Sequence, residues 1–297
     1  MTPCEPSKGG VVPPALRARP DGPGDALIPD LERTAAQVRL DVLGMIHRAG
    51  SGHPGGSLSA VEILVHLYFR EMHLSPDQPF DDDRDRFILS KGHAAPALYS
   101  VLARRGYLDP SELDTLRRVG SRLQGHPDMR RLPFLDASTG SLGQGFATAV
   151  GMARGLAARG SRSTVFCLLG DGELQEGIVW EAAAGAAHAR LSNIVAVVDC
   201  NGVQLDGTVD SIKRQKPAST MWLAWGWHPV DTDGHSFESL SSAFMEARAC
   251  SGPAVLCART IKGKGVSFME GSCSWHGRCP DEGELERARA EILGGGL

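Results

Sequence analysis

The sequence predicts an α/β fold in which a doubly wound, mostly parallel sheet is flanked by helices. Four short runs rich in Val, Ile, Leu or Cys have the length and composition of buried strands, and they fall at 164–169, 194–199, 227–231 and 254–259. Helical stretches lie between them, at about 177–190, 217–225 and 236–250. Strands that alternate with helices at this spacing form parallel sheets joined by right-handed crossovers.

The N-terminal half has a weaker pattern. Residues 1–29 contain seven prolines and little apolar periodicity, which predicts a disordered tail ahead of a single domain at 30–297. A helix is expected from Leu31 to Gly50, because apolar residues recur at steps of three and four. SGHPGGS (51–57) is expected to form a loop before a second helix at about 59–72. DDDRDRFILSKGH (81–93) is expected to run from a polar turn through a short apolar piece into another loop.

The composition describes a globular chain without the features of a nucleic-acid or membrane protein. It has 297 residues, 42% of them hydrophobic, and a formal net charge of −4. This charge, without a basic stripe, argues against nucleic-acid binding. No apolar run approaches the roughly 18–20 residues needed to cross a bilayer, and the N-terminus lacks the apolar core of a signal peptide. We therefore expect a cytoplasmic protein that binds neither nucleic acid nor membrane.

A carboxylate and an amide follow two consecutive predicted strands. Asp171 ends the first strand in LLGDGELQEG (168–177), and Asn201 ends the next in VVDCNGV (197–203). Parallel strands present their carboxyl ends at one edge of a sheet, where ligands bind. Hard oxygen ligands of this kind suit Mg²⁺ or Ca²⁺, and the carbonyl oxygen of Val203 could add a third. Gly170 and Gly172 would let the backbone approach a phosphate. Taken alone, Gly-Asp-Gly could equally form a surface turn.

Six segments, in order, resemble those of transketolases. The stretch from Gly170 to Gly207, GDGELQEGIVWEAAAGAAHARLSNIVAVVDCNGVQLDG, resembles the thiamine diphosphate (ThDP) motif of that family. The others are SGHPGGSLSAVEIL, RFILSKGHAAPALY, GHPDM, STGSLGQGFATAVGMA and TIKGKGVSFME followed by WHG. The resemblance covers about residues 31–295. It implies the ThDP diphosphate-binding domain of transketolase type.

The resemblance also implies which residues bind the cofactor. The divalent metal, Mg²⁺ with Ca²⁺ or Mn²⁺ as possible substitutes, would be held against the diphosphate by Asp171, Asn201 and the Val203 carbonyl. The residues expected to line the cofactor are Lys91, Ser141, Leu142, Gly143, Gly170, Gly172, Lys262 and His276. By themselves the glycines of GSLGQG could instead mark close helix packing, and Lys262 could be an ordinary loop lysine.

Four histidines lie in glycine-containing loops that converge on the cofactor and the sugar in the resembled family. They are His53 in SGHPG, His93 in KGHAAP, His126 in QGHPD and His276 in SWHGR. The resemblance implies that these catalytic residues bind hydroxyl groups of the donor and move protons, which suits imidazole near neutral pH. For His235 in DTDGHSF (231–237) two interpretations stay open, a place at the same strand edge and a role in closing a turn.

The resemblance further implies a partner chain. A whole transketolase has roughly twice this length, with a pyrimidine-binding domain that carries the activating glutamate, and no glutamate here has a matching context. We therefore expect the N-terminal subunit of a split transketolase, inactive alone and assembled with a C-terminal subunit as an α₂β₂ heterotetramer. The complex would transfer a two-carbon ketol unit from a ketose phosphate to an aldose phosphate or another acceptor.

Two alternative functions stay open. The first is the α subunit of a 2-oxoacid dehydrogenase or decarboxylase, which shares the ThDP motif. The second is a non-catalytic binding subunit that has kept the fold.

Overall fold

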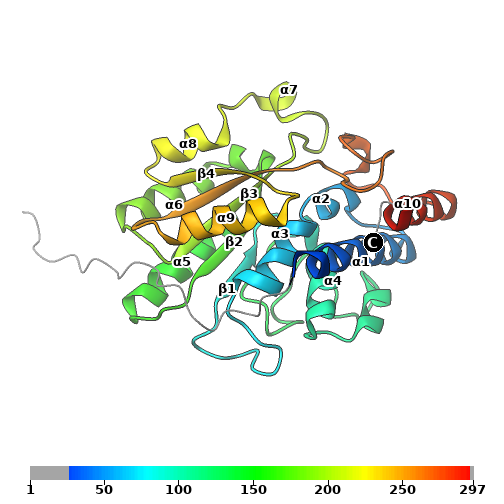
Figure 1. Cartoon of the computed structure of the whole chain (residues 1–297), viewed down its shortest axis with the longest axis horizontal. Helices are drawn as coiled ribbons and strands as arrows, with labels where there is room; N and C mark the ends of the chain where they lie inside the picture. The colour runs from blue at the N-terminus through cyan, green and yellow to red at the C-terminus, as the bar shows by residue number, and fades with distance from the viewer. Residues whose placement is uncertain (1–26, 295–297) are drawn as a thin grey trace, which may run out of the picture.

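The computed structural model describes residues 27–294, which contain one parallel five-stranded sheet. The strands are β1 (Arg86–Leu89), β2 (Val165–Gly170), β3 (Ile194–Cys200), β4 (His228–Asp233) and β5 (Ala254–Arg259). Their order across the sheet is β1-β2-β3-β5-β4, and every neighbouring pair is parallel (Figure 1). The predicted fold class is confirmed, and the four predicted strands are present to within two residues.

Helices cover both faces of the sheet, so that alternate strand residues face different cores. One core joins the sheet to α1 (Ile28–Ala49), α3 (Val61–His66), α4 (Ala95–Arg105) and α9 (Phe237–Arg248). The other core joins it to α5 (Gln144–Ala158), α6 (Gly177–His188) and α8 (Ala218–Ala224). On β2, Phe166 and Leu168 belong to the first core and Cys167 and Leu169 to the second. This two-sided burial explains why the strands are almost continuously apolar.

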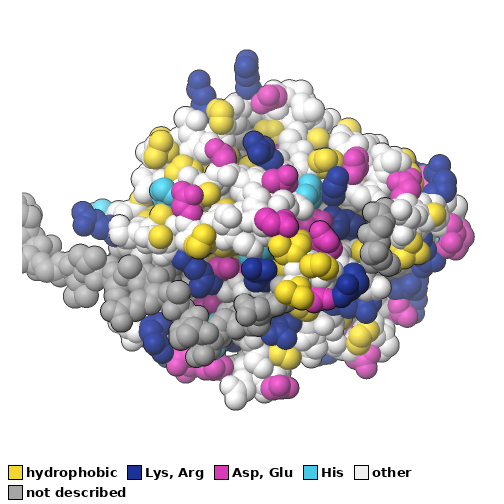
Figure 2. Space-filling view, in the orientation of Figure 1, with side chains coloured by type: hydrophobic (Ala, Val, Ile, Leu, Met, Phe, Trp, Pro, Cys, Tyr) yellow, Lys and Arg dark blue, Asp and Glu magenta, His cyan; other side chains and the backbone are white. Residues whose placement is uncertain are grey.

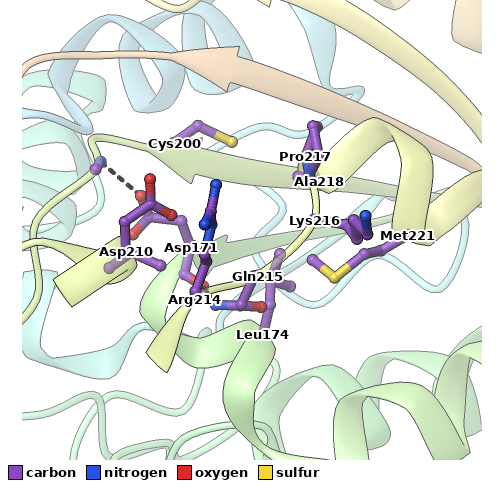
Figure 3. A pocket seen from close by; sticks show the side chains of 12 residues that line it. Asp171, Leu174, Cys200, Asp210, Arg214, Gln215, Lys216, Pro217, Ala218 and Met221 are labelled. Atoms are coloured by element: carbon purple, nitrogen blue, oxygen red, sulfur yellow. Dashed lines mark hydrogen bonds between the residues drawn. The ribbon is translucent and has the colours of Figure 1, made fainter. Parts of the chain in front are cut away.

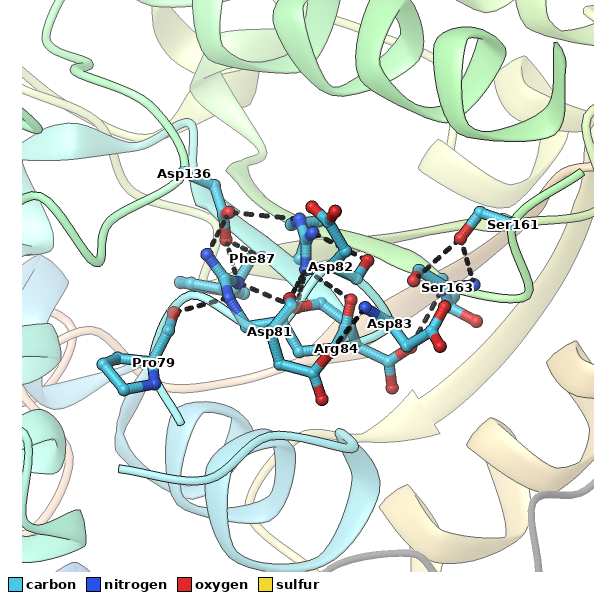
Figure 4. Close-up of polar contacts among 12 residues, drawn as sticks. Pro79, Asp81, Asp82, Asp83, Arg84, Phe87, Asp136, Ser161 and Ser163 are labelled. Atoms are coloured by element: carbon cyan, nitrogen blue, oxygen red, sulfur yellow. Dashed lines mark hydrogen bonds and ion pairs between the residues drawn. The ribbon is translucent and has the colours of Figure 1, made fainter. Parts of the chain in front are cut away.

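Strand β1 is the one strand of the described chain that the sequence did not predict. It has only four residues and lies at the edge of the sheet. Asp136 holds the segment before it, because its carboxylate accepts hydrogen bonds from Arg84 (2.7 and 3.1 Å) and from the backbone N–H of Phe87 (2.9 Å) (Figure 4). The contacts that fix β1 therefore come from a residue about fifty positions away.

The N-terminal helices differ from the prediction in their boundaries. Helix α1 begins at Ile28 instead of Leu31, and Gly50 ends it in the left-handed conformation (φ 65°), as expected. Most of the predicted tail, residues 1–26, lies outside the described residues. SGHPGGS is not only a loop, because Pro54–Leu58 form the short helix α2. The helix predicted at 59–72 is α3 followed by a π-helical turn at Leu67–Glu71.

The remaining elements are short or peripheral. They are α7 (Val209–Lys213), α10 (Glu282–Gly294) and the 3₁₀ turns Gly92–Ala94, Pro110–Thr115, Gly172–Gln175 and Cys273–Trp275. None of the helices between residues 27 and 294 is long and apolar enough to cross a membrane. Figure 2 shows acidic and basic side chains interspersed over one face of the molecule.

Candidate active site

The carboxyl ends of β2 and β3 bring Asp171 and Asn201 together. The two strands are neighbours, with Gly170 paired to Asp199. The Asp171 carboxylate accepts hydrogen bonds from the backbone N–H groups of Gly172 (2.8 Å) and Gly202 (2.6 Å), so it reaches the loop that follows β3. In the same loop, Oδ1 of Asn201 accepts the N–H of Val203 at 3.1 Å. The structure thus brings Asp171 to the loop that carries Asn201 and Val203, the other two predicted metal ligands.

The electrostatics of Asp171 suit a bound cation. Burial, and next the nearby Asp199 carboxylate, raise the pKa of Asp171 to about 6. A positive ion beside this carboxylate would favour its charged form and so offset the cost of burial. The groups that could bind the metal are one carboxylate, one amide oxygen and one backbone carbonyl. No group of three or more His, Cys, Asp or Glu side chains arranged to hold a metal occurs among the residues described. A metal would need phosphate oxygens or water to complete its shell, which fits Mg²⁺.

Lys262 places a buried ammonium group beside this loop. Its side chain is 1% exposed, and Nζ donates to the carbonyl oxygens of Val203 (3.3 Å) and Gln204 (3.1 Å). Burial, followed by the charge of Lys91, lowers the pKa of Lys262 to about 8. Gly55 permits this packing, since a Cβ there would lie 3.0 Å from the Lys262 side chain. An anion such as a diphosphate would relieve the repulsion between the two lysines.

Lys91 is also buried and is paired with Asp199 on β3. The Asp199 carboxylate also accepts hydrogen bonds from the hydroxyl groups of Ser59 (2.6 Å) and Thr260. Burial alone would raise the pKa of Asp199, but the ion pair with Lys91 holds it below its ordinary value. This network ties the loop after β1, the segment after β5 and the end of α2 to the centre of the sheet. Lys91 is therefore held rigidly near the predicted diphosphate position.

The four predicted histidines form one cluster. The ring centroid of His53 lies 5.6 Å from that of His93, 6.1 Å from that of His126 and 5.4 Å from that of His276. His93 and His276 are 5.2 Å apart. These rings come from four separate loops, and only folding brings them together.

The cluster is neutral near physiological pH. Burial, with nearby cations, lowers the pKa of His53 and of His276 to about 4. The pKa values of His93 and His126 are also lowered, again mainly by burial. Nζ of Lys262 lies 3.2 Å from Nδ1 of His276, and an ammonium group can only donate. The proton of the neutral His276 ring is therefore on Nε2. These rings can bind the hydroxyl and carbonyl oxygens of a sugar.

The loop at 140–143 connects the histidines to the end of β2. A Cβ on Gly140 would lie 3.5 Å from the His126 ring, and the N–H of Gly143 donates to Glu173 at 2.7 Å. Ser141 is exposed and Leu142 half-buried between these two contacts. Gly143 begins helix α5 with φ 79°. Two N–H groups at this helix start are already bonded within the chain, that of Gly143 to Glu173 and that of Phe146 to Ser90.

A cavity of about 420 Å³ opens on another side of Asp171. The segment 209–218 and Met221 line most of it, and Figure 3 shows Arg214, Gln215 and Asp210 around Asp171. The histidine cluster contributes none of its lining residues. Of the predicted site residues, the cavity therefore adjoins Asp171 but not the predicted sugar site.

The sequence did not single out three residues that the site depends on. Arg117 contacts His53, Asp199 binds Lys91, and Glu173 holds both Gly143 and Gly170. Glu173 and Asp199 stand within the recognised motif, so their position alone could have drawn attention to them. Arg117 has no such signal, because nothing in its local sequence distinguishes it from Arg118.

His235 lies at the strand edge, where both of its ring nitrogens have partners. Its Nδ1 lies 2.9 Å from the Glu62 carboxylate, and its Nε2 accepts the backbone N–H of Ile261 at 2.8 Å. It joins the loop after β4 to the segment that carries Lys262.

Comparisons with known proteins agree with this geometry. Residues 31–294 match the family described as transketolase, thiamine diphosphate binding domain. The chain is 44% identical over 264 residues to the 6-deoxy-6-sulfo-D-fructose transketolase subunit SqwG of Clostridium sp. (strain MSTE9), covering 89% of this chain and 96% of that protein. It is 41% identical to human transketolase over 88% of this chain and 42% of the human protein. The transketolase of Campylobacter jejuni has a TM-score of 0.85 at 31% identity, over 90% of this chain and 43% of that one.

Proposed function

This chain belongs to the transketolase family, as a thiamine diphosphate-binding domain, and we propose that it is one subunit of a two-component, Mg²⁺-dependent transketolase. The observation that carries the proposal is the arrangement at one sheet edge. Asp171 and the loop of the other proposed metal ligands, two buried lysines and four neutral histidines lie there. The likeness to a protein named as a transketolase subunit, over 96% of its length, supports the two-component form.

The partner would supply the pyrimidine-binding domain and its activating glutamate. The chain spans less than half the length of the human and Campylobacter transketolases that it matches. We propose an α₂β₂ heterotetramer, since symmetric assemblies are the commonest form of oligomer. A cytoplasmic location forms part of the same proposal.

The residues of this chain would bind, orient and move protons. Asp171, Asn201 and the Val203 carbonyl would present oxygens to Mg²⁺, while Lys262 and Lys91 would offset the diphosphate charge. The bound cofactor supplies an electron sink for breaking a carbon–carbon bond beside a carbonyl group. His53, His93, His126 and His276 would hold the hydroxyl and carbonyl oxygens of the sugar and exchange protons at those atoms.

The proposed substrate is a ketose phosphate, which gives a two-carbon ketol unit to an aldose phosphate or another acceptor. We assign none of the side chains of this site to the phosphate group of the donor. We propose that the partner subunit binds that group. Because one relative is named for 6-deoxy-6-sulfo-D-fructose, that sugar is a second donor to assay.

The test is to co-purify this chain with a candidate pyrimidine-domain subunit from the same genome. Ketol transfer from xylulose 5-phosphate and from 6-deoxy-6-sulfo-D-fructose would be measured with ThDP and Mg²⁺. We expect transfer only from the complex, and little transfer after His276→Ala although the cofactor still binds. Full activity of the lone chain would refute the two-component form. Decarboxylation of a 2-oxoacid by the complex would favour the α subunit of a 2-oxoacid enzyme, and turnover of neither class would favour a non-catalytic subunit.

A further inference from the structure

Arg117 has a backbone conformation that arginine rarely adopts. Its φ is 58°. The backbone N–H of the next residue, Arg118, donates a hydrogen bond to the carbonyl oxygen of Thr115 at 3.0 Å. Leu116 precedes it with φ −46° and ψ 128°, so residues 115–118 form a type II turn with Arg117 in the third position. Glycine is the favoured residue there, because other side chains are strained at positive φ. An arginine at such a position suggests that its side chain has a function that offsets the strain.

The guanidinium of Arg117 is directed into the histidine cluster. Nη1 donates to Oγ of Ser51 at 2.6 Å, and Nη2 lies 3.3 Å from Nδ1 of His53. Gly125, next to His126, leaves room for it, since a Cβ there would lie 2.9 Å from Nε of Arg117. Nε is buried and has no hydrogen-bond partner among residues 27–294. Burial of a charged group with an unpartnered nitrogen is unfavourable, so it too points to a functional role.

The chemistry of the pair fixes the proton on His53. A guanidinium carries only donors and stays charged at all ordinary pH values. Nδ1 of His53 must therefore accept with its lone pair, which leaves Nε2 as the nitrogen that carries hydrogen in the neutral ring. No protein group within the described chain takes the Nε2 hydrogen, so it is available for a ligand. Burial first, and then the charges of Arg117, His126 and Lys262, lower the pKa of His53 and keep the ring neutral.

We propose that Arg117 is a positioning residue that holds His53 in the Nε2–H tautomer, so that His53 donates a hydrogen bond to an oxygen of the sugar. The resting ring is then a donor and not a proton acceptor. This assignment deepens the proposed function and rests on it for the identity of the ligand. The tautomer itself depends only on contacts within this chain.

The test observes the tautomer directly. The full chain would be labelled with nitrogen-isotope histidine, and proton–nitrogen correlation spectra would be recorded at pH 7.5. The His53 signals would be assigned by their loss in His53→Gln. We expect a protonated Nε2 and an unprotonated Nδ1 in the wild-type chain. His276 is an internal reference, since Lys262 and not Arg117 contacts its Nδ1.

Two variants and a control separate positioning from folding. Arg117→Met should give His53 a mixture of tautomers and shift its pKa upward, toward the ordinary value of 6.5, while His276 keeps its pattern. Arg117→Lys keeps a charged group that can only donate and should retain the Nε2–H form. Arg118→Met, which changes the exposed neighbour, should leave His53 unaltered. A protonated Nδ1 in the wild type, or an unchanged tautomer in a folded Arg117→Met, would overturn the proposal.

The result is independent of catalysis. If Arg117→Met does not fold, the wild-type spectrum and Arg117→Lys still decide the tautomer. The spectra require neither cofactor nor partner, so failure of the ketol-transfer assay leaves the tautomer assignment standing. Conversely, a wrong tautomer would not by itself refute the transketolase function.

Discussion

The carboxylate of Glu173 accepts the backbone N–H of Gly143 at 2.7 Å, across thirty residues of sequence. The same carboxylate accepts the N–H of Gly170 at 3.0 Å and the hydroxyl of Ser90. It thereby joins the start of α5, the end of β2 and the loop after β1, which are three segments expected to surround the diphosphate. Its side chain is almost fully buried, and burial raises its pKa.

We expect Glu173→Ala to destabilise the chain and loosen the cofactor site. It would leave three donors without an acceptor, two of them buried, which costs about 3 kcal/mol of unfolding free energy. Glu173→Gln keeps one acceptor oxygen and should lose about 1 kcal/mol. Denaturant unfolding measures both values. Glu181→Gln, at an exposed site on α6, should stay within about 0.5 kcal/mol of wild type. Equal stability of Glu173→Ala and wild type would show that these hydrogen bonds are unimportant.

The fold was predictable where its signal is local. Strands β2, β3 and β5 are apolar runs of six or seven residues, and their alternation with helices gives the parallel sheet. Strand β1 has no such signal, since Asp136 and pairing with β2 make four residues into an edge strand. Likewise, the glycines of SGHPGGS suggested a loop. Gly55 and Gly56 are instead helical, and Lys262 packs against the first and His93 against the second, which the local sequence cannot reveal.

In the candidate active site, too, some features follow from local sequence and others depend on long-range contacts. The proximity of Asp171 and Asn201 followed from a general rule, because both end neighbouring parallel strands. The histidine cluster could be expected only from the family resemblance, since its four loops are far apart in sequence. Glu173, Asp199 and Arg117 act through long-range contacts. For these residues, the sequence identifies a charged side chain but not its partner.

His235 should affect cofactor binding through Lys262. Because Nε2 of His235 accepts the Ile261 N–H, its hydrogen is on Nδ1 and is donated to Glu62. His235→Ala would release the segment that carries Lys262, and we expect the ThDP affinity of the assembled enzyme to fall about tenfold. Lys262→Met should lower it at least as much. If His235 acts through Lys262, the double variant should bind no more weakly than Lys262→Met alone. Additive losses of affinity would show that His235 does not act through Lys262. The control is His228→Ala, at an exposed histidine of β4, which should leave the affinity unchanged.

His66 should make the chain less stable in acid. It is buried on α3, where Nε2 lies 3.1 Å from Oγ of Ser241 and Nδ1 has no partner within the described part of the chain. Burial lowers its pKa to about 3, against 6.5 for the free side chain. The unfolded chain therefore binds more protons between these values, so stability is lost as the pH falls from about 6.5 toward 3. The contribution of His66 is up to about 1.4 kcal/mol per pH unit.

The variant His66→Gln tests this pH dependence, because the amide can still donate to Ser241. Unfolding free energies at several pH values should decline less steeply in acid than those of wild type. His188→Gln, which alters an exposed histidine of α6, should keep the wild-type profile. Parallel profiles for His66→Gln and wild type would mean that His66 is already protonated or is not buried as described.

Asp171→Asn should separate metal binding from folding. The substitution removes the only carboxylate among the three proposed metal ligands, so we expect Mg²⁺-dependent ThDP binding to the assembled enzyme to weaken by at least about tenfold. Without metal and cofactor, the substitution should change the stability of the fold little or even raise it, because burial and Asp199 already disfavour the charged carboxylate. Thermal melts with and without Mg²⁺ and ThDP measure both effects: the added ligands should stabilise wild type but not the variant. Asp210→Asn, at an exposed position lining the same cavity, should behave as wild type. Stabilisation of Asp171→Asn equal to that of wild type would remove Asp171 from the proposed metal site.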